Sequence, residues 1–218
     1  MEIVSEWIGR VPYQQAWDLQ RRIFNDVSAG HGPNRFILCE HPDVLTIGRN
    51  ARDDRNLLYS RNELEAMGYE VYDVDRGGDV TYHGPGQLVG YPIIRLADYR
   101  EDLGWYIRSL EDLIIHVIGR KGLHGGRKAN LTGVWVGEKK ICAIGVRASR
   151  WTTMHGFALN VTTNLDRFDA IIPCGIEDYQ VTSIRNEGGG DATVEEVAAL
   201  AAQCWSVAMD PAERPGAH

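Results

Sequence analysis

The sequence has few cysteines and no pairing pattern among them. Its 218 residues include Cys39, Cys142, Cys174 and Cys204, with no CxxC pair and no Cys/His spacing typical of a zinc site. Neither a disulfide framework nor a structural metal is therefore indicated. A chain of this length buries about 70% of the surface that its unfolded form exposes, so it needs no cross-link to hold a core. We expect four thiols, which fits a reducing cytoplasm.

The sequence also lacks a long apolar run. No stretch approaches the roughly 20 apolar residues of a membrane span. The acidic start, residues 1–6, has no apolar core of signal-peptide length. We therefore expect neither export nor membrane insertion, and a cytoplasmic protein.

Basic residues do not dominate the composition. The chain has 23 Lys and Arg against 30 Asp and Glu, a net charge of −7, which argues against general nucleic-acid binding because that needs a dominant basic face. Two local basic groups stand out, one at Arg49, Arg52, Arg55 and Arg61 and one at Lys139, Lys140, Arg147 and Arg150. Each group is either a solvated face or a docking patch for an acidic partner.

Helical and strand patterns alternate along the chain without a regular βαβ rhythm. The spacing predicts helices over residues 12–29, 60–68, 103–121 and 193–205, the second and fourth opened by the capping boxes Ser60-x-x-Glu63 and Thr193-x-x-Glu196. Strands are predicted over residues 35–39, 44–47, 69–74, 133–136, 140–146 and 154–161, with a hairpin turn at 137–139. The pattern predicts one α/β or α+β domain with a mixed sheet, followed by a disordered tail at residues 210–218.

Residues 76–87 form the most unusual segment. They read Arg-Gly-Gly-Asp-Val-Thr-Tyr-His-Gly-Pro-Gly-Gln and lie between two apolar runs. Glycine lets the backbone turn sharply or approach a ligand closely, and successive N–H groups can then face one acceptor. A pocket wall and a tight turn are both consistent with this pattern. The segment matches neither the P-loop nor the dinucleotide-binding motif, so phosphate binding is not indicated.

Cys174 stands between Pro173 and Gly175, which excludes a helix interior and favours a rigid, exposed turn. A thiol reacts as its thiolate, and a neighbouring cation lowers its pKa, so a nucleophile here needs a partner. From these residues alone, an inert thiol is the more common case.

The other cysteines have weaker claims to chemistry. Cys39 and Cys204 fall on a predicted strand and a predicted helix at core positions. Cys142 lies two residues from Lys140, and strand alternation puts both side chains on one face, so Cys142 remains a rival nucleophile.

Most of the histidines fit a structural role. His31, His41, His116 and His124 are expected to be hydrogen-bonded structural residues. His83 and His155 differ because glycine follows each and a strand meets a loop there. They leave open a Cys-His hydrolase, although the surroundings of Cys174 do not match papain-like or caspase signatures.

Four motifs together, in order and spacing, resemble the lipoyl(octanoyl) transferases. They are the segment 76–87, Gly-Glu-Lys-Lys-Ile-Cys-Ala-Ile-Gly-Val-Arg at 137–147, His-Gly-Phe-Ala-Leu-Asn at 155–160 and Pro-Cys-Gly-Ile at 173–176. The resemblance spans nearly the whole chain. The His-Gly-Pro-Gly continuation at 83–86 distinguishes these transferases from the related lipoate and biotin ligases.

This resemblance implies that an octanoyl group passes from octanoyl-acyl carrier protein to a lysine of a lipoyl domain. The acceptors would be 2-oxoacid dehydrogenases and the glycine-cleavage H protein, with sulfur inserted later by another enzyme. The family's nucleophile aligns with Cys174 and its partner with Lys140 as a dyad. Lys139 is adjacent, but strand alternation allows only one of the two to face a pocket, and we assign Lys140.

The implied chemistry fits these residue types. A lysine ammonium stabilises a thiolate, and a desolvated lysine with a lowered pKa accepts the proton of the incoming amine. Because the donor is already a thioester, the implied reaction needs no ATP, cofactor or metal.

The resemblance also implies a substrate site and a fold. The residues implied to line the acyl site are Arg76, Gly77, Gly78, Asp79, Val80, Thr81, Tyr82, His83, Ala143, Ile144, Gly145, Gly156, Phe157 and Ala158. The implied fold is that of biotin and lipoate ligases, a mixed β-sheet flanked by helices, with one catalytic domain over residues 1–209.

Two other functions remain open at this point. A lipoate or biotin protein ligase would activate a free acid as an adenylate and would use a lysine without a cysteine nucleophile. A non-catalytic protein would bind lipoyl domains or carrier protein through the two groups of basic residues.

Overall fold

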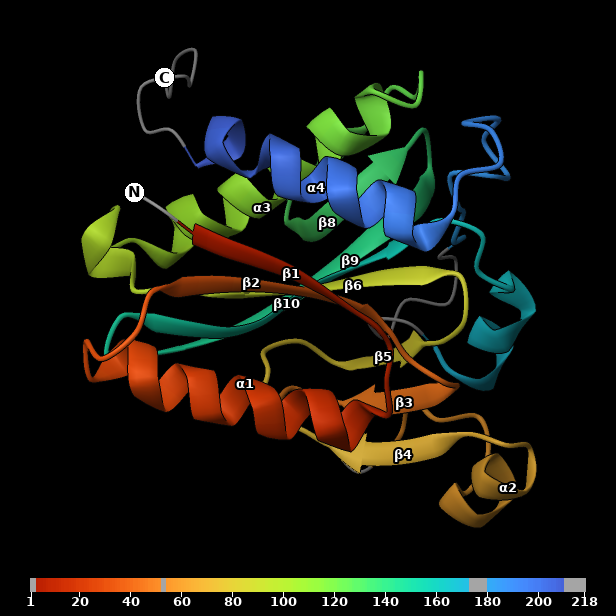
Figure 1. Ribbon diagram of the computed structural model, residues 1–218. Coiled ribbons are helices and arrows are strands. Elements are labelled where there is room, and N and C mark those ends of the chain that lie inside the picture. Colours follow the sequence, from red (N-terminus) through yellow and green to blue (C-terminus); the bar gives the residue numbers. More distant parts are fainter. Residues whose placement is uncertain (1–2, 52–53, 173–179, 210–218) are drawn as a thin grey trace.

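The computed structural model describes residues 3–51, 54–172 and 180–209, and a seven-stranded sheet forms its centre (Figure 1). The strand order is β1-β2-β6-β10-β9-β8-β7. The bounds are β1 Ile3–Arg10, β2 Asn34–Glu40, β6 Gln87–Ile93, β7 Gly126–Lys128, β8 Leu131–Val136, β9 Lys139–Ser149 and β10 Thr152–Asn160. β1 runs parallel to β2 and every other neighbouring pair is antiparallel, so the sheet is mixed.

A smaller sheet of three strands lies beside the larger one (Figure 1). In it, β3 (Val44–Ile47) pairs in parallel with β4 (Glu70–Asp73) and antiparallel with β5 (Val80–His83). The short helix α2 (Arg61–Ala66) packs next to β4. The smaller sheet has its own apolar cluster, which includes Leu45, Tyr82 and Phe168.

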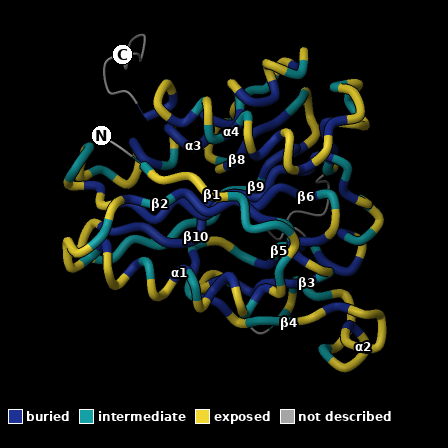
Figure 2. The backbone as a smooth tube through the Cα atoms, viewed as in Figure 1, coloured by how far each residue is buried: buried dark blue, intermediate teal, exposed yellow. Residues whose placement is uncertain are grey.

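Helices cover both faces of the larger sheet. α3 (Leu103–Gly119) and α4 (Val194–Ala208) lie together on one face, and α1 (Tyr13–Ser28) lies on the other (Figure 1). The 3-10 helices η1 (Leu96–Asp98) and η2 (Leu165–Ala170) complete the set. Figure 2 shows buried backbone concentrated in the central strands and the inner sides of these helices. This layering confirms the predicted mixed sheet flanked by helices.

The local sequence signals are confirmed where they are strongest. Both predicted capping boxes form, with Ser60 and Thr193 as the N-cap residues. The predicted helix at 103–121 is α3, whose buried side chains follow the predicted spacing. The predicted hairpin joins β8 and β9.

The sequence patterns missed some strands. β1, β5, β6 and β7 were not predicted; β5 lies within the glycine-rich segment 76–87 and β6 begins at its last residue. Within the described residues, no helix is both long and apolar enough to cross a membrane. The predicted tail at 210–218 lies outside the described residues.

The capping box of α4 generates a stability prediction. The Thr193 Oγ1 accepts a hydrogen bond from the Glu196 backbone N–H at 3.2 Å. Thr193→Ala removes this acceptor and should lower the free energy of unfolding by about 1 kcal/mol, measured by urea denaturation. Thr193→Ser keeps the hydroxyl and should stay close to the wild type. Equal stability of the alanine and serine variants would show that the cap does not stabilise α4.

Candidate active site

A cavity of about 420 Å³ lies between the two sheets. Its walls come from β5 of the smaller sheet, from β6, β9 and β10 of the larger sheet, and from Tyr13 at the start of α1. Much of the lining is apolar, including Val89, Ile144, Phe157 and Ala158. Small-molecule pockets typically measure roughly 300–1,000 Å³ and have mostly apolar walls. The cavity is therefore suited to a short aliphatic chain.

The glycine-rich loop forms one wall of this cavity by close backbone contact with β9. The Gly77 N–H donates to the Val146 carbonyl at 2.9 Å. A β-carbon at Gly145 would lie 2.9 Å from the Gly77 carbonyl oxygen, so a larger residue there would push the loop away. This packing explains why glycine occurs in both segments, and it supports the interpretation of residues 76–79 as a pocket wall.

Arg76 holds the glycine-rich loop in place through buried hydrogen bonds of its side chain. Its side chain is 7% exposed, and its guanidinium donates to the Thr46 carbonyl at 2.6 Å and to the Thr46 hydroxyl at 2.9 Å. A further hydrogen bond goes to the Gly77 carbonyl at 3.1 Å. Arg76 therefore ties the loop to β3 as well as lining the cavity.

All the residues that the resemblance assigns to the acyl site line the cavity except Tyr82. Side chains alternate along β5, so Thr81 and His83 reach the cavity while Tyr82 points into the core of the smaller sheet. There the Tyr82 hydroxyl donates to Asp43 Oδ1 at 2.6 Å, and its ring packs edge-on against Phe168. The expectation that Tyr82 lines the acyl site is therefore corrected.

Lys140 lies at the start of β9 and lines the cavity with only 7% of its surface exposed. Its ammonium nitrogen lies 5.3 Å from the centre of the Trp135 ring. Its backbone N–H donates to the Gln180 carbonyl at 2.8 Å, and its carbonyl accepts from the Thr182 N–H at 2.9 Å. The segment that begins at residue 180 thus pairs with the backbone of Lys140 through these two hydrogen bonds.

Lys139 faces away from the cavity, as strand alternation predicts. It lines a separate open groove, and its side chain forms an ion pair with Glu187 at 3.4 Å. The structure therefore brings Lys140, and not Lys139, to the cavity.

A chain of buried side-chain hydrogen bonds connects β5 with the backbone beside Lys140. His83 Nδ1 is hydrogen-bonded to Gln87 Oε1 at 2.8 Å, and Gln87 Nε2 donates to Asn160 Oδ1 at 2.9 Å. Asn160 in turn donates to the Thr182 carbonyl at 2.9 Å. This network fixes β5, β6 and β10 relative to the segment that pairs with Lys140.

His83 lines the cavity, and it and its neighbour His41 are both buried and have lowered pKa values. Burial, and next to it the neighbouring His41, lowers the pKa of His83 to about 3. Burial lowers the pKa of His41 to about 4, and its ring is hydrogen-bonded to the Tyr91 hydroxyl at 2.8 Å. The Tyr13 ring stacks on His83. The sequence analysis expected a structural role for His41, and these contacts agree with it.

His155 closes another side of the cavity. Its backbone has a φ of 58°, and its Nε2 is hydrogen-bonded to Asp75 Oδ1 at 2.7 Å. Asp75 also pairs with Arg147, and these partners, His155 first, lower the pKa of the Asp75 carboxyl to about 2. Burial lowers the pKa of His155. Arg147 therefore has its charge compensated within the molecule.

The three cysteines that the structure describes are free thiols with raised pKa values. Burial raises the pKa of Cys39, Cys142 and Cys204, most strongly for Cys39 and Cys142. Cys142 lines the cavity, and Lys140 opposes this rise without overcoming the effect of burial. The rival nucleophile Cys142 thus stays protonated at neutral pH.

Cys174 lies outside the described residues. The chain on either side of this gap is held close to the cavity walls. The Ile172 N–H donates to the Asn56 carbonyl at 2.9 Å, and the Asn56 side chain donates to Asp79 in the glycine-rich loop. On the other side, Gln180 pairs with Lys140.

Sequence analysis missed several residues that line the cavity. They include Tyr13, Gln87, Val89, Tyr91, Leu103, Ile107, Leu131, Thr132, Phe168 and Val181. Gln87 is the last residue of the glycine-rich motif, which was the available signal. The others belong to elements far apart in the sequence, and no local pattern marks them.

Comparisons with known proteins place the chain in a family. It matches the family described as lipoyl protein ligase A/B catalytic domain over residues 12–205. A protein of Rubrobacter xylanophilus named octanoyltransferase is 51% identical over 182 residues, which are 83% of this chain and 81% of that protein. An octanoyltransferase of Chloroflexus aurantiacus is 48% identical over 214 residues, which are 96% of each chain.

Solved structures share the fold at low sequence identity. Lipoate-protein ligase A bound with ATP has a TM-score of 0.80 and 17% identity, covering 95% of this chain and 85% of that one. The biotin protein ligase of Aquifex aeolicus has a TM-score of 0.53 and 16% identity, covering 95% and 69%. The shared fold, the family match and the two relatives agree, and the chain therefore belongs to the lipoyl protein ligase A/B catalytic domain family.

Proposed function

We propose that this protein is an octanoyltransferase of protein lipoylation, with a catalytic domain over residues 1–209. It carries the octanoyl group as a thioester on Cys174 and passes it to the ε-amine of a lysine in a lipoyl domain. The observation that carries the proposal is the buried Lys140 on the wall of a largely apolar cavity. The high identity to proteins named octanoyltransferase supports the same activity.

The cavity walls match an acyl chain better than a polar substrate. Val89, Ile144 and Phe157 offer apolar surface, and burying each methylene group of a fatty chain contributes about 0.8 kcal/mol. The glycine-rich loop presents backbone close to the opposite side. An acyl chain can therefore lie in the cavity between the two sheets, with its carbonyl toward Lys140.

The choice of Cys174 rests on the resemblance and on the properties of the other thiols. Cys39, Cys142 and Cys204 all have raised pKa values, which makes them poor nucleophiles at neutral pH. Cys174 is two residues after Ile172 and six before Gln180, both of which are bonded to segments at the cavity.

In the first half-reaction, the Cys174 thiolate attacks the thioester carbonyl of octanoyl-acyl carrier protein. A new C–S bond forms, the bond to the carrier's sulfur breaks, and the released thiolate takes a proton from the ammonium of Lys140, which becomes neutral. The ammonium of Lys140 stabilises the attacking thiolate by its charge. No phosphate activation is needed because the donor is already a thioester.

In the second half-reaction, the acceptor amine attacks the octanoyl-Cys174 carbonyl. Lys140, left neutral by the first half-reaction, takes the proton of this amine as the C–N bond forms and the C–S bond breaks. Cys174 is released as a thiolate beside the re-formed ammonium. One lysine thus serves both half-reactions, and another enzyme inserts sulfur into the octanoyl chain afterwards.

The partners are octanoyl-acyl carrier protein as donor and, as acceptors, the lipoyl domains of 2-oxoacid dehydrogenases and the glycine-cleavage H protein. Of the basic groups considered for docking, Arg61 and Arg147 form ion pairs with carboxylates of the chain itself. Their charges are thus compensated before a partner binds. The free thiols at Cys39, Cys142 and Cys204 fit a reducing cytoplasm as the site of the reaction.

Intact-mass spectrometry tests the proposed thioester directly. Incubation with octanoyl-acyl carrier protein should add one octanoyl group to the wild-type protein and none to Cys174→Ser. Cys142→Ser is the matched control and should gain the group normally. A protein that only binds the carrier would gain no covalent mass in any variant.

The same variant separates transfer from ATP-dependent ligation. With free octanoate and ATP, a ligase would acylate a lipoyl domain without a cysteine nucleophile. We expect no such product from the wild-type protein or from Cys174→Ser. Undiminished ATP-dependent acylation by Cys174→Ser would contradict the covalent mechanism.

Lys140→Ala tests the second member of the dyad. Loss of the ammonium should raise the pKa of the Cys174 thiol, because the nearby positive charge that favours the thiolate is gone. The rate of Cys174 alkylation against pH should therefore shift to higher pH, and both half-reactions should slow by at least about 10²-fold. Lys139→Ala should leave the profile in place. An unchanged profile in Lys140→Ala would remove this residue from its assigned role.

A further inference from the structure

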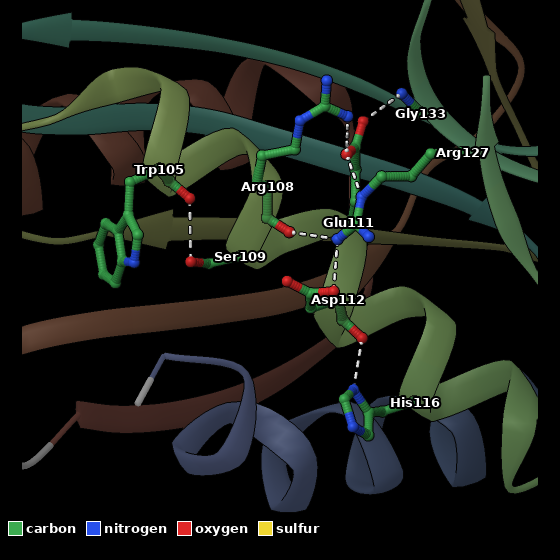
Figure 3. A network of polar contacts seen from close by, with 8 residues as sticks. All are labelled: Trp105, Arg108, Ser109, Glu111, Asp112, His116, Arg127 and Gly133. Carbon is green, nitrogen blue, oxygen red and sulfur yellow. Dashed lines mark hydrogen bonds and ion pairs between the residues drawn. The ribbon is translucent and has the colours of Figure 1, made fainter. Parts of the chain in front are cut away.

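Glu111, in the middle of α3, carries a carboxylate that no solvent reaches, with 0% of its side chain exposed. Figure 3 shows this carboxylate between two arginines and the backbone of Gly133. Its Oε2 accepts from Arg108 at 2.6 Å and from Arg127 at 2.8 Å, while its Oε1 accepts from the Gly133 N–H at 3.1 Å. Arg127 also pairs with Asp112, so the four charged side chains balance.

Gly133 in turn lies against Lys140. A β-carbon at Gly133 would be 2.6 Å from the Lys140 Cε and 2.6 Å from the Cys142 carbonyl oxygen, so only glycine lets the lysine stem pass here. The backbone of Gly133 has a φ of 131°, which side chains rarely allow. The register of β8 with β9 is irregular at this point, between Val134 and Trp135.

We propose that Glu111 is a positioning residue for Lys140: its carboxylate holds the Gly133 peptide in the place where β8 supports the lysine stem. This inference rests on the proposed function, in which Lys140 is the partner of Cys174. Glu111 contacts neither substrate nor reacting atoms in the proposal, and it positions Lys140 through Gly133.

Stability alone does not account for this buried carboxylate. Burying a carboxylate is costly, and well-packed apolar residues often replace buried ion pairs with no loss of stability. Arg108 and Arg127 offset the cost of the charge, but the second oxygen of Glu111 goes to a backbone N–H in an irregular strand. This hydrogen bond connects the ion-pair cluster to Gly133, and Gly133 contacts the side chain of Lys140. The cluster is therefore linked to the candidate active site.

A pair of variants at position 111 separates the hydrogen bond from the charge. Glu111→Leu removes the acceptor for the Gly133 N–H, so Gly133 and Lys140 should move. The kcat of octanoyl transfer should then fall by about tenfold or more with little change in KM, since small displacements of a reacting group cost large factors in rate. Glu111→Gln keeps one carbonyl acceptor for the three donors, Gly133 and the two arginines, and should therefore recover only part of the lost kcat.

The pH profile of Cys174 alkylation adds a readout that a merely structural role would not move. Displacing Lys140 should shift the profile of Glu111→Leu to higher pH, toward that of Lys140→Ala. Removing the negative charge of Glu111 acts in the opposite sense and should shift Glu111→Gln slightly to lower pH. The other charged groups around Lys140 stay in both variants: Arg108, Arg127, and the Lys128–Glu138 pair beside Trp135.

Asp112→Asn is the matched control, since it removes the negative charge paired with the same Arg127 but leaves Gly133 untouched. It should match the wild type in kcat and in the pH profile. If Glu111→Leu does not fold, as judged by circular dichroism, Gly133→Ala replaces it, because the added methyl group would displace the same lysine stem.

Two results would overturn the inference. One is a folded Glu111→Leu protein with wild-type kcat and pH profile, and the other is a loss of kcat in the control Asp112→Asn as large as in Glu111→Leu. Lys140→Ala is measured alongside. If its pH profile of Cys174 alkylation coincides with that of the wild type, the proposed function itself has failed. A shift in Lys140→Ala without a shift in Glu111→Leu would reject only the role of Glu111.

Discussion

Burial of the Lys140 side chain is the constraint around which the candidate site is organised. A cationic side chain inside a protein costs free energy unless its surroundings compensate the charge. Here the stem of Lys140 passes over Gly133, its ammonium lies near the face of Trp135, and its backbone pairs with the segment that begins at Gln180. These contacts come from β8, β9 and the chain after the proposed nucleophile, so placing this one side chain requires all three to be in register.

The second requirement is a cavity between two sheets that are not continuous with each other. The glycine-rich loop crosses from the smaller sheet to β9 and meets it at backbone distance, with Gly77 bonded to Val146. Arg76 holds the other side of the loop to Thr46 in β3. A wider side chain at the contact would separate the sheets and open the cavity to water. The apolar volume that suits an acyl chain therefore depends on the same glycines that make the motif recognisable.

The elements with local signals were predictable from the sequence. The capping boxes at Ser60 and Thr193 and the periodicity of α3 depend on residues three or four apart, and all are confirmed. Alternation along β9 likewise predicted that Lys140 and not Lys139 would face a pocket, which agrees with the structure.

Features that depend on tertiary contact were not predictable in this way. Alternation on β5 turns Tyr82 away from the cavity, but the sequence did not reveal which face of this strand would be the outer one. The bond from Glu111 to Gly133 joins residues 22 apart, and it involves a strand irregularity that no spacing marks. Tyr13 reaches the cavity from a helix whose pattern predicted only a core position.

The central claim is that the octanoyl group is held as a thioester on Cys174 and is transferred from it to a lysine amine without ATP. Single-turnover transfer tests this most directly: the protein is acylated by octanoyl-acyl carrier protein, freed of the carrier, and mixed with a lipoyl domain in the absence of ATP. The account predicts that octanoyl mass disappears from the protein and appears on the lipoyl domain at the same rate, and that this rate is at least as fast as steady-state turnover. An acylated protein that keeps its octanoyl group, or that transfers it more slowly than turnover, would contradict the account.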